Sequence, residues 1–158
     1  MKLRSVFAIS ALMSALIAVP SIAAPDVYVV NFRSDSEPTS KMLDEALDTA
    51  ISLAGVEAEQ VSVDTTTAAK LERCAHDAVY RNLVPVFYRW FGLHGFDAIV
   101  DADTKAVIGC VTPGIAPRDM ARELRRMALT AQGEAVLTQA STGPATQCPD
   151  AYNKPLEE

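Results

Sequence analysis

Cysteine and histidine are both scarce in this chain of 158 residues, which has three cysteines and two histidines. So few cysteines exclude a small fold that is held together by many disulfides. No zinc-ligand spacing occurs among these residues, and a Ser-His-Asp set cannot be inferred from histidines this few. We therefore expect no metal site and no cofactor.

Basic residues are also few in comparison with acidic ones. Without Lys2 and Arg4, which fall in the predicted leader below, 12 basic side chains stand against 20 acidic ones, a net charge of −8. Nucleic-acid affinity rests on the neutralisation of phosphates by Lys and Arg. This charge balance therefore excludes nucleic acid as a general partner.

A single long hydrophobic run is present, at the N-terminus. Lys2 and Arg4 precede an apolar run over 6–19, and a small-residue cleavage site follows at 21–23. This order is typical of a secretory signal peptide, and its core of about 14 residues is shorter than the roughly 20 that span a membrane. We expect residues 1–23 to be cleaved on export. Because no second run of this kind follows, we expect no transmembrane span in the mature protein.

The mature chain of about 135 residues predicts one domain over 24–140, followed by an extended polar tail over 141–158. A small acidic domain with a simple signal and few cysteines is more typical of a bacterial periplasmic protein than of a disulfide-rich secreted module. We expect a periplasmic location, with other periplasmic or envelope proteins as partners.

Hydrophobic periodicity predicts an alternation of strands and helices in an α/β domain with one mixed four-stranded sheet. The nearly continuous apolar run at 27–32 predicts a central strand that is covered on both faces. The predicted segments are a strand over 27–32, a helix over 43–54, a strand over 61–63, a helical pair over 68–83 and 86–91, a β-hairpin over 96–101 and 106–111, and a helix over 117–131.

Residues 91–109 combine an aromatic-Gly-aliphatic turn, a strand, a hairpin that contains Asp, and a Gly at the end of the next strand, with Trp90 just before the turn. This stretch and the order of elements resemble thioredoxin-like proteins, in particular the non-classical ones that conjugative and integrating elements export to the periplasm. The resemblance implies a thioredoxin-like fold and an accessory role in a conjugation or secretion system. The chain departs from the family at 33–38, which lacks the redox Cys-x-x-Cys, and at Asp97, which stands where the family has a cis-proline.

The three cysteines allow one disulfide and leave one thiol. Cys110 falls at the end of a predicted strand and Cys148 in the tail, so a bridge between them would pin the tail and stabilise the fold by a few kcal/mol. We favour this pairing, with Cys74 as a small buried side chain on its helix. An intermolecular bridge and a reactive thiol at Cys74 remain open alternatives.

Six of the chain's aromatic residues lie within the seventeen residues from 80 to 96. We expect the predicted helical pair to pack most of them over the sheet. The alternative is that Tyr88, Trp90, Phe91 and His94 form an exposed surface for a partner, because aromatic residues are enriched at interface centres.

Three functions follow from these observations. The first is a non-catalytic, protein-binding accessory domain that has lost the redox dithiol. The second is a thiol-disulfide oxidoreductase or chaperone that uses Cys74 or Cys110, which the lack of a resolving thiol beside either residue disfavours. The third is a carrier of a small ligand, with the aromatic cluster as its pocket.

Overall fold

The computed structural model describes residues 24–133 and 147–150, so the predicted signal peptide and most of the predicted tail lie outside the described residues. The elements are β1 (Val27–Arg33), α1 (Pro38–Ala54), β2 (Ala58–Asp64), α2 (Ala68–Tyr80), α3 (Val84–Arg89), β3 (Phe96–Asp101), β4 (Val107–Val111) and α4 (Pro117–Ala131). This order confirms the predicted α/β class. No helix of the described part is long and apolar enough to cross a membrane.

The four strands form one mixed sheet in the order β2-β1-β3-β4. β1 pairs in parallel with β2, and β3 runs antiparallel to both β1 and β4. A parallel pair needs a crossover connection, which α1 supplies, whereas the antiparallel pair β3–β4 needs only a short turn. The predicted central position of β1 is confirmed.

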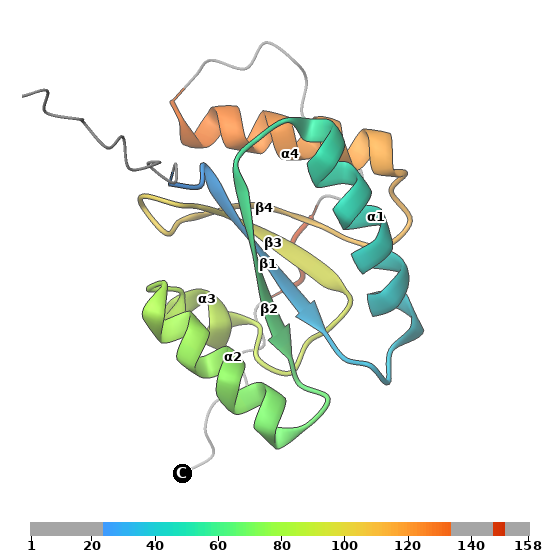
Figure 1. The fold of residues 1–158 in the computed structure, drawn as a ribbon, viewed down its shortest axis with the longest axis vertical. Helices are drawn as coiled ribbons and strands as arrows, with labels where there is room; N and C mark the ends of the chain where they lie inside the picture. The colour runs from blue at the N-terminus through green and yellow to red at the C-terminus, as the bar shows by residue number, and fades with distance from the viewer. Residues whose placement is uncertain (1–23, 134–146, 151–158) are drawn as a thin grey trace, which may run out of the picture.

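Two pairs of helices cover the two faces of the sheet. Figure 1 shows α1 and α4 on one side and α2 and α3 on the other. Because side chains alternate along a strand, Val27 and Val29 of β1 pack beneath α1 and α4, whereas Val30 and Phe32 pack beneath α2 and α3. Burial on both faces explains why the whole of β1 is apolar up to Asn31.

A proline lies in the first turn of three of the four helices. Pro38, Pro85 and Pro117 each lie in a first turn, where a missing backbone donor costs nothing. Pro85 separates α3 from α2, as predicted. The first helix begins at Pro38, five residues before the predicted start at 43, so this start was predicted wrongly.

Candidate functional site

Three loops meet at one edge of the sheet, where β1 and β2 end and β3 begins. The backbone nitrogen of Thr65 donates to the carbonyl of Arg33 at 3.2 Å, and that of Gly95 donates to the carbonyl of Phe32 at 2.7 Å. We call this edge, residues 33–37, 64–67 and 92–95, the polar corner. Carboxyl ends of parallel strands are where open α/β sheets commonly bind ligands, so the corner is the first candidate site.

Ion pairs tie the loops of the polar corner together. The Lys70 ammonium lies 2.8 Å from a carboxylate oxygen of Asp64 and 2.5 Å from one of Asp35. Burial pushes the pKa of Asp64 upward, but hydrogen bonds from Lys70 and Thr66 outweigh this effect and lower the pKa to about 2. Asp64 is therefore ionised at neutral pH, and its carboxylate is already bonded to Lys70 and Thr66.

Arg33 joins the same network from the end of β1. Its guanidinium lies 2.9 Å from Asp35 and 3.3 Å from Asp44 of α1. The hydrogen bonds that Lys70 donates to Asp35 and Asp64 in turn raise the pKa of Lys70. The strongest charges of the corner thus neutralise one another, which leaves little unpaired charge for a ligand.

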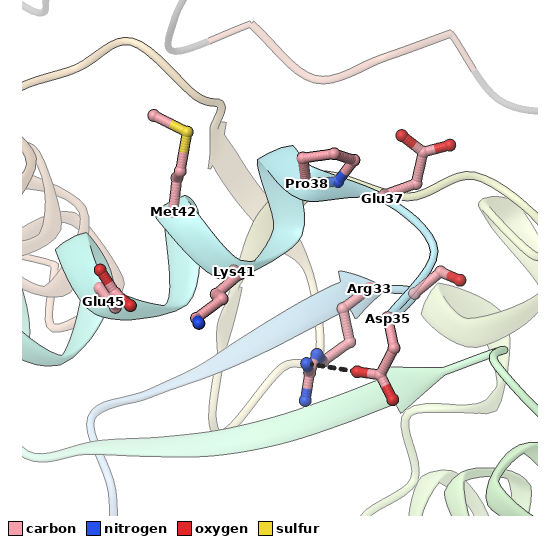
Figure 2. A pocket seen from close by; sticks show the side chains of 8 residues that line it. Arg33, Asp35, Glu37, Pro38, Lys41, Met42 and Glu45 are labelled. Carbon is pink, nitrogen blue, oxygen red and sulfur yellow. Dashed lines mark hydrogen bonds and ion pairs between the residues drawn. The ribbon is translucent and has the colours of Figure 1, made fainter.

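A hollow of about 440 Å³ lies beside the corner, between the end of β1 and the first turns of α1. Figure 2 shows the Arg33 guanidinium joined to Asp35 at one end of it. The hollow is lined by Arg33, Ser34, Asp35, Glu37, Pro38, Lys41, Met42 and Glu45. Its lining mixes both charges and holds neither cysteine nor histidine, so the dithiol that the resemblance would place here is absent from this set of residues.

Asp97 is buried beneath α1 with no exposed surface. It pairs in register with Asn31 of β1, and neither of its carboxyl oxygens has a hydrogen-bond partner among the described residues. The Asn31 amide donates to Asp44 at 2.7 Å, and its own carbonyl oxygen is also unpartnered within that part of the chain. Three buried acceptors thus lack a hydrogen bond of good geometry within the described residues, although the Asn31 amide lies close enough to Asp97 to act on its pKa.

A proton on Asp97 would supply a donor at this place. Burial raises the pKa of Asp97 well above its usual value, the charge of Asp44 adds to this rise, and the Asn31 amide opposes it only in part. The neutral acid can donate to the carbonyl oxygen of Asn31, which satisfies two of the buried groups at once. The sequence marked Asp97 only as a departure from the family pattern, although an acidic residue inside an apolar strand is itself a sign of a buried titratable group.

Cys110 and Cys148 form a disulfide and Cys74 is free, as predicted. The sulfur atoms of Cys110 and Cys148 lie 2.11 Å apart, at bonding distance, and bridge a separation of 38 residues. Cys74 has an unpaired thiol with 8% of the residue exposed, and its sulfur accepts a hydrogen bond from the backbone nitrogen of Asp64 at 3.2 Å. Burial denies this thiol the access that thiol exchange requires.

Trp90 lies in the core, as expected if the helical pair packs most of the aromatic residues over the sheet, and not on the exposed surface of the alternative prediction. Its side chain is fully buried, edge-on to Phe32 and Phe96 at centroid distances of 5.8 and 5.6 Å. Its indole nitrogen donates to the carbonyl of Pro149 at 2.9 Å. The ring is held in the core by the sheet on one side and by the segment after Cys148 on the other.

Tyr88 and Phe91 are exposed, as the partner-surface alternative expected, by 68% and 41%. Both rings contact the buried ring of Phe87, at centroid distances of 5.3 and 5.6 Å, so they belong to one surface. His94 is also exposed, and its Nε2 lies 2.7 Å from the hydroxyl of Thr65 in the polar corner.

The sequence missed two further members of this side of the molecule. Val79 and Tyr80 are exposed at the last turn of α2, within the predicted helical pair. The buried residues of α2 are Cys74 and Ala78. We call Val79, Tyr80, Tyr88 and Phe91 the aromatic face. These four are most of the six large hydrophobic residues that are exposed in the described chain, the other two being Met42 and Leu53 of α1.

Comparison with protein-family models, with curated proteins and with solved structures found no match to this chain. The polar corner and the aromatic face are the two candidate regions that the described residues offer. The corner presents mutually paired charges, and the aromatic face presents apolar side chains to water.

Proposed function

We propose that this chain is an exported, thioredoxin-like domain of the periplasm that has lost the redox dithiol and binds other proteins through its aromatic face. An accessory role in a conjugation or secretion system is the setting that the sequence resemblance suggests. The observation that carries the proposal is the concentration of exposed large apolar side chains between 79 and 91.

The strand order supports the thioredoxin-like part of the proposal. A β-α-β unit followed by two helices, an antiparallel hairpin and a closing helix, in the order β2-β1-β3-β4, is what the resemblance implies. Residues 33–38 occupy the connection from β1 into α1, where the family holds its dithiol, and none of them is a cysteine.

The chemistry of the polar corner argues for binding rather than catalysis. A general acid or base needs a pKa near the working pH, whereas the pKa of Asp64 is about 2 and its carboxylate is held by Lys70 and Thr66. Of the two other candidates for chemistry, Cys74 is buried and Cys110 is bonded to Cys148. These observations disfavour a thiol enzyme.

The aromatic cluster is a poor pocket for a carried ligand, because its rings fill one another's space. Phe32 stacks on Phe96 at 4.8 Å, and Trp90 closes against both rings. Packing of this kind is that of a core. The exposed aromatic residues lie outside this cluster, on the end of α3 and the turn that follows.

The aromatic face has the composition of an interface centre. Exposed tyrosine and phenylalanine offer large apolar area at little cost in side-chain entropy, and arginine is the charged residue that most often joins them. Arg89 is exposed beside Tyr88, stands over the ring of Trp90 at 4.7 Å, and makes no ion pair with the described residues. A protein partner with an apolar patch and a carboxylate at its rim fits this surface.

Site-specific photo-crosslinking in exporting cells tests the proposal. A photoreactive phenylalanine analogue is placed at Tyr88 or Phe91 and, as a matched control, at Met42 or Leu53, which are equally exposed on the opposite face of the sheet. We expect a discrete adduct with one envelope protein from positions 88 and 91 only. Equal crosslinking from all four positions, or none from 88 and 91, contradicts the proposal.

A further inference from the structure

A short segment, Gln147–Asp150, lies against the face of the sheet that α2 and α3 cover, and we call it the strap (red in Figure 1). Two contacts hold it. Cys148 is bonded to Cys110 of β4, and the carbonyl of Pro149 accepts the hydrogen bond of the Trp90 indole. The strap therefore joins the edge strand of the sheet to the end of α3.

The strap completes the cover of one hydrophobic cluster. Cys148 packs against the buried cluster that contains Trp90, Phe96, Val100 and Cys110. Trp90 is fully buried although its chain neighbours Arg89 and Phe91 are both exposed. Within the described chain, the carbonyl of Pro149 is the one recorded partner of the indole nitrogen. Without the strap, a buried N–H group would lose its acceptor, which costs roughly 1–3 kcal/mol unless water replaces it.

We propose that the strap is a redox-released cover: a dithiol reductant that opens the Cys110–Cys148 bond frees the strap and exposes the Trp90 indole beside Tyr88 and Phe91. The release does not depend on the proposed function. A consequence for binding does rest on it, since an exposed Trp90 would enlarge the aromatic face.

The two sulfur atoms differ in solvent exposure, and this difference decides which of them an incoming thiolate attacks. Cys110 is fully buried, whereas Cys148 is partly exposed, so an incoming thiolate reaches the Cys148 sulfur first. A mixed disulfide forms there and Cys110 leaves as a thiolate that takes up a proton. The second thiolate of the reductant then attacks the reductant's own sulfur in the mixed disulfide and releases Cys148 as a thiol. Two electrons and two protons pass to the protein, and the reductant leaves as a cyclic disulfide.

The strand pairing of the sheet does not depend on contacts with the strap. Cys110 stays paired in register with Ala98 of β3, and α4 packs over the other face of β3 and β4. The strap is thus an added cover on a sheet whose strands are already paired. We expect reduction to move the strap and leave the secondary structure in place.

Trp90 is the only tryptophan of the chain, so tryptophan fluorescence reports the cover directly. The exported protein is measured as oxidised wild type, as wild type in dithiothreitol, and as the variants Cys148→Ser and Cys74→Ser. We expect a red shift of the emission and a several-fold rise in acrylamide quenching for the reduced protein and for Cys148→Ser. Cys74→Ser, which keeps the disulfide, should match oxidised wild type, and far-ultraviolet circular dichroism should be the same for all four samples.

Unchanged emission and quenching after reduction overturn the proposal, because the indole would then be covered without the strap. A red shift that comes with loss of the circular dichroism signal also overturns it, because the protein would have unfolded rather than uncovered one ring. A second measurement follows the yield of photo-crosslinks from position 88, which should rise in Cys148→Ser. If crosslinks at 88 are absent in every sample, the proposed function fails while the fluorescence result still decides the strap.

Discussion

The two faces of the sheet are closed in different ways. α1 and α4, of 17 and 15 residues, cover one face mainly with apolar side chains. The other face is covered by α2 and α3, of 13 and 6 residues, and by the disulfide-bonded strap. The face with the shorter helices is also the one that leaves aromatic residues in water. Under the proposed function, the α1/α4 face would serve mainly stability and the α2/α3 face would serve recognition.

The largest expected effect is on the α1/α4 face. Leu47→Ala truncates a fully buried side chain of α1 that packs on the sheet, and it should lower the free energy of unfolding by about 2–5 kcal/mol. Leu53→Ala, on the same helix but exposed, should change it by less than about 0.5 kcal/mol. Denaturant unfolding of both variants measures the difference. Similar losses for the two would show that α1 is not the stabilising cover described above.

The next effect concerns the cover of the opposite face. Cys148→Ser should lower the free energy of unfolding by about 2–4 kcal/mol, because the unfolded chain regains the freedom that the bridge removes. Thiol titration of the denatured, non-reduced protein should give one thiol for wild type and two for this variant. Three thiols in fresh wild-type protein would exclude the bridge, and a dimer on a non-reducing gel would indicate an intermolecular one instead.

A smaller effect is the pH dependence of the stability, which tests the buried carboxyl group of Asp97 under the α1/α4 face. Since the folded pKa of Asp97 is raised, the folded state binds a proton that the unfolded state loses near pH 4. Stability should therefore fall as pH rises from about 4 toward the folded pKa, by up to about 1.4 kcal/mol per pH unit. Asp97→Asn, which keeps the shape without the proton, should lack this fall. It should equal wild type near pH 3 and exceed it at pH 7 by more than about 1 kcal/mol.

Other carboxyl groups titrate in the same range, so the difference between the two proteins is the quantity to follow in chemical unfolding. Asn31 of β1 and Asp44 of α1 are the neighbours that act on the pKa of Asp97, and both are unchanged in the variant. Parallel stability curves from pH 3 to pH 8 would contradict a protonated Asp97.

The last prediction is that the protein has no disulfide reductase activity. The purified mature domain should reduce insulin in the presence of dithiothreitol no faster than its triple Cys→Ser variant, because Cys74 is buried and no second thiol lies beside it to resolve an exchange. Activity well above that variant would move function to Cys110 and would overturn the division of roles between the two faces.

The sequence predicted those features that depend on local pattern. The apolar run of β1, the break at Pro85 and the pairing of Cys110 with Cys148 follow from composition, periodicity and position in the chain. Features that depend on packing escaped it. The burial of Trp90 agrees with the predicted packing of aromatic residues over the sheet, but its hydrogen bond to the strap, 59 residues away in sequence, was not predicted. No periodicity in the α3 region reports such a contact.

The polar corner was missed for the same reason. Lys70 meets Asp35 across 35 residues and only because two loops end at one edge of the sheet. The exposure of Val79 was missed because helical periodicity does not show where the sheet beneath a helix ends. The protonated acid at Asp97 needed knowledge of Asn31 and Asp44, which the fold alone brings beside it.

The most direct test of the division between the two faces is an affinity measurement with the partner that photo-crosslinking identifies. The double variant Tyr88→Ala/Phe91→Ala should raise the Kd at least about tenfold, which corresponds to about 1.4 kcal/mol. The matched double variant Met42→Ala/Leu53→Ala, which removes exposed apolar area from the other face, should leave the Kd within about twofold. Equal losses for the two double variants, or a loss confined to the second, would contradict a recognition surface on the α2/α3 face.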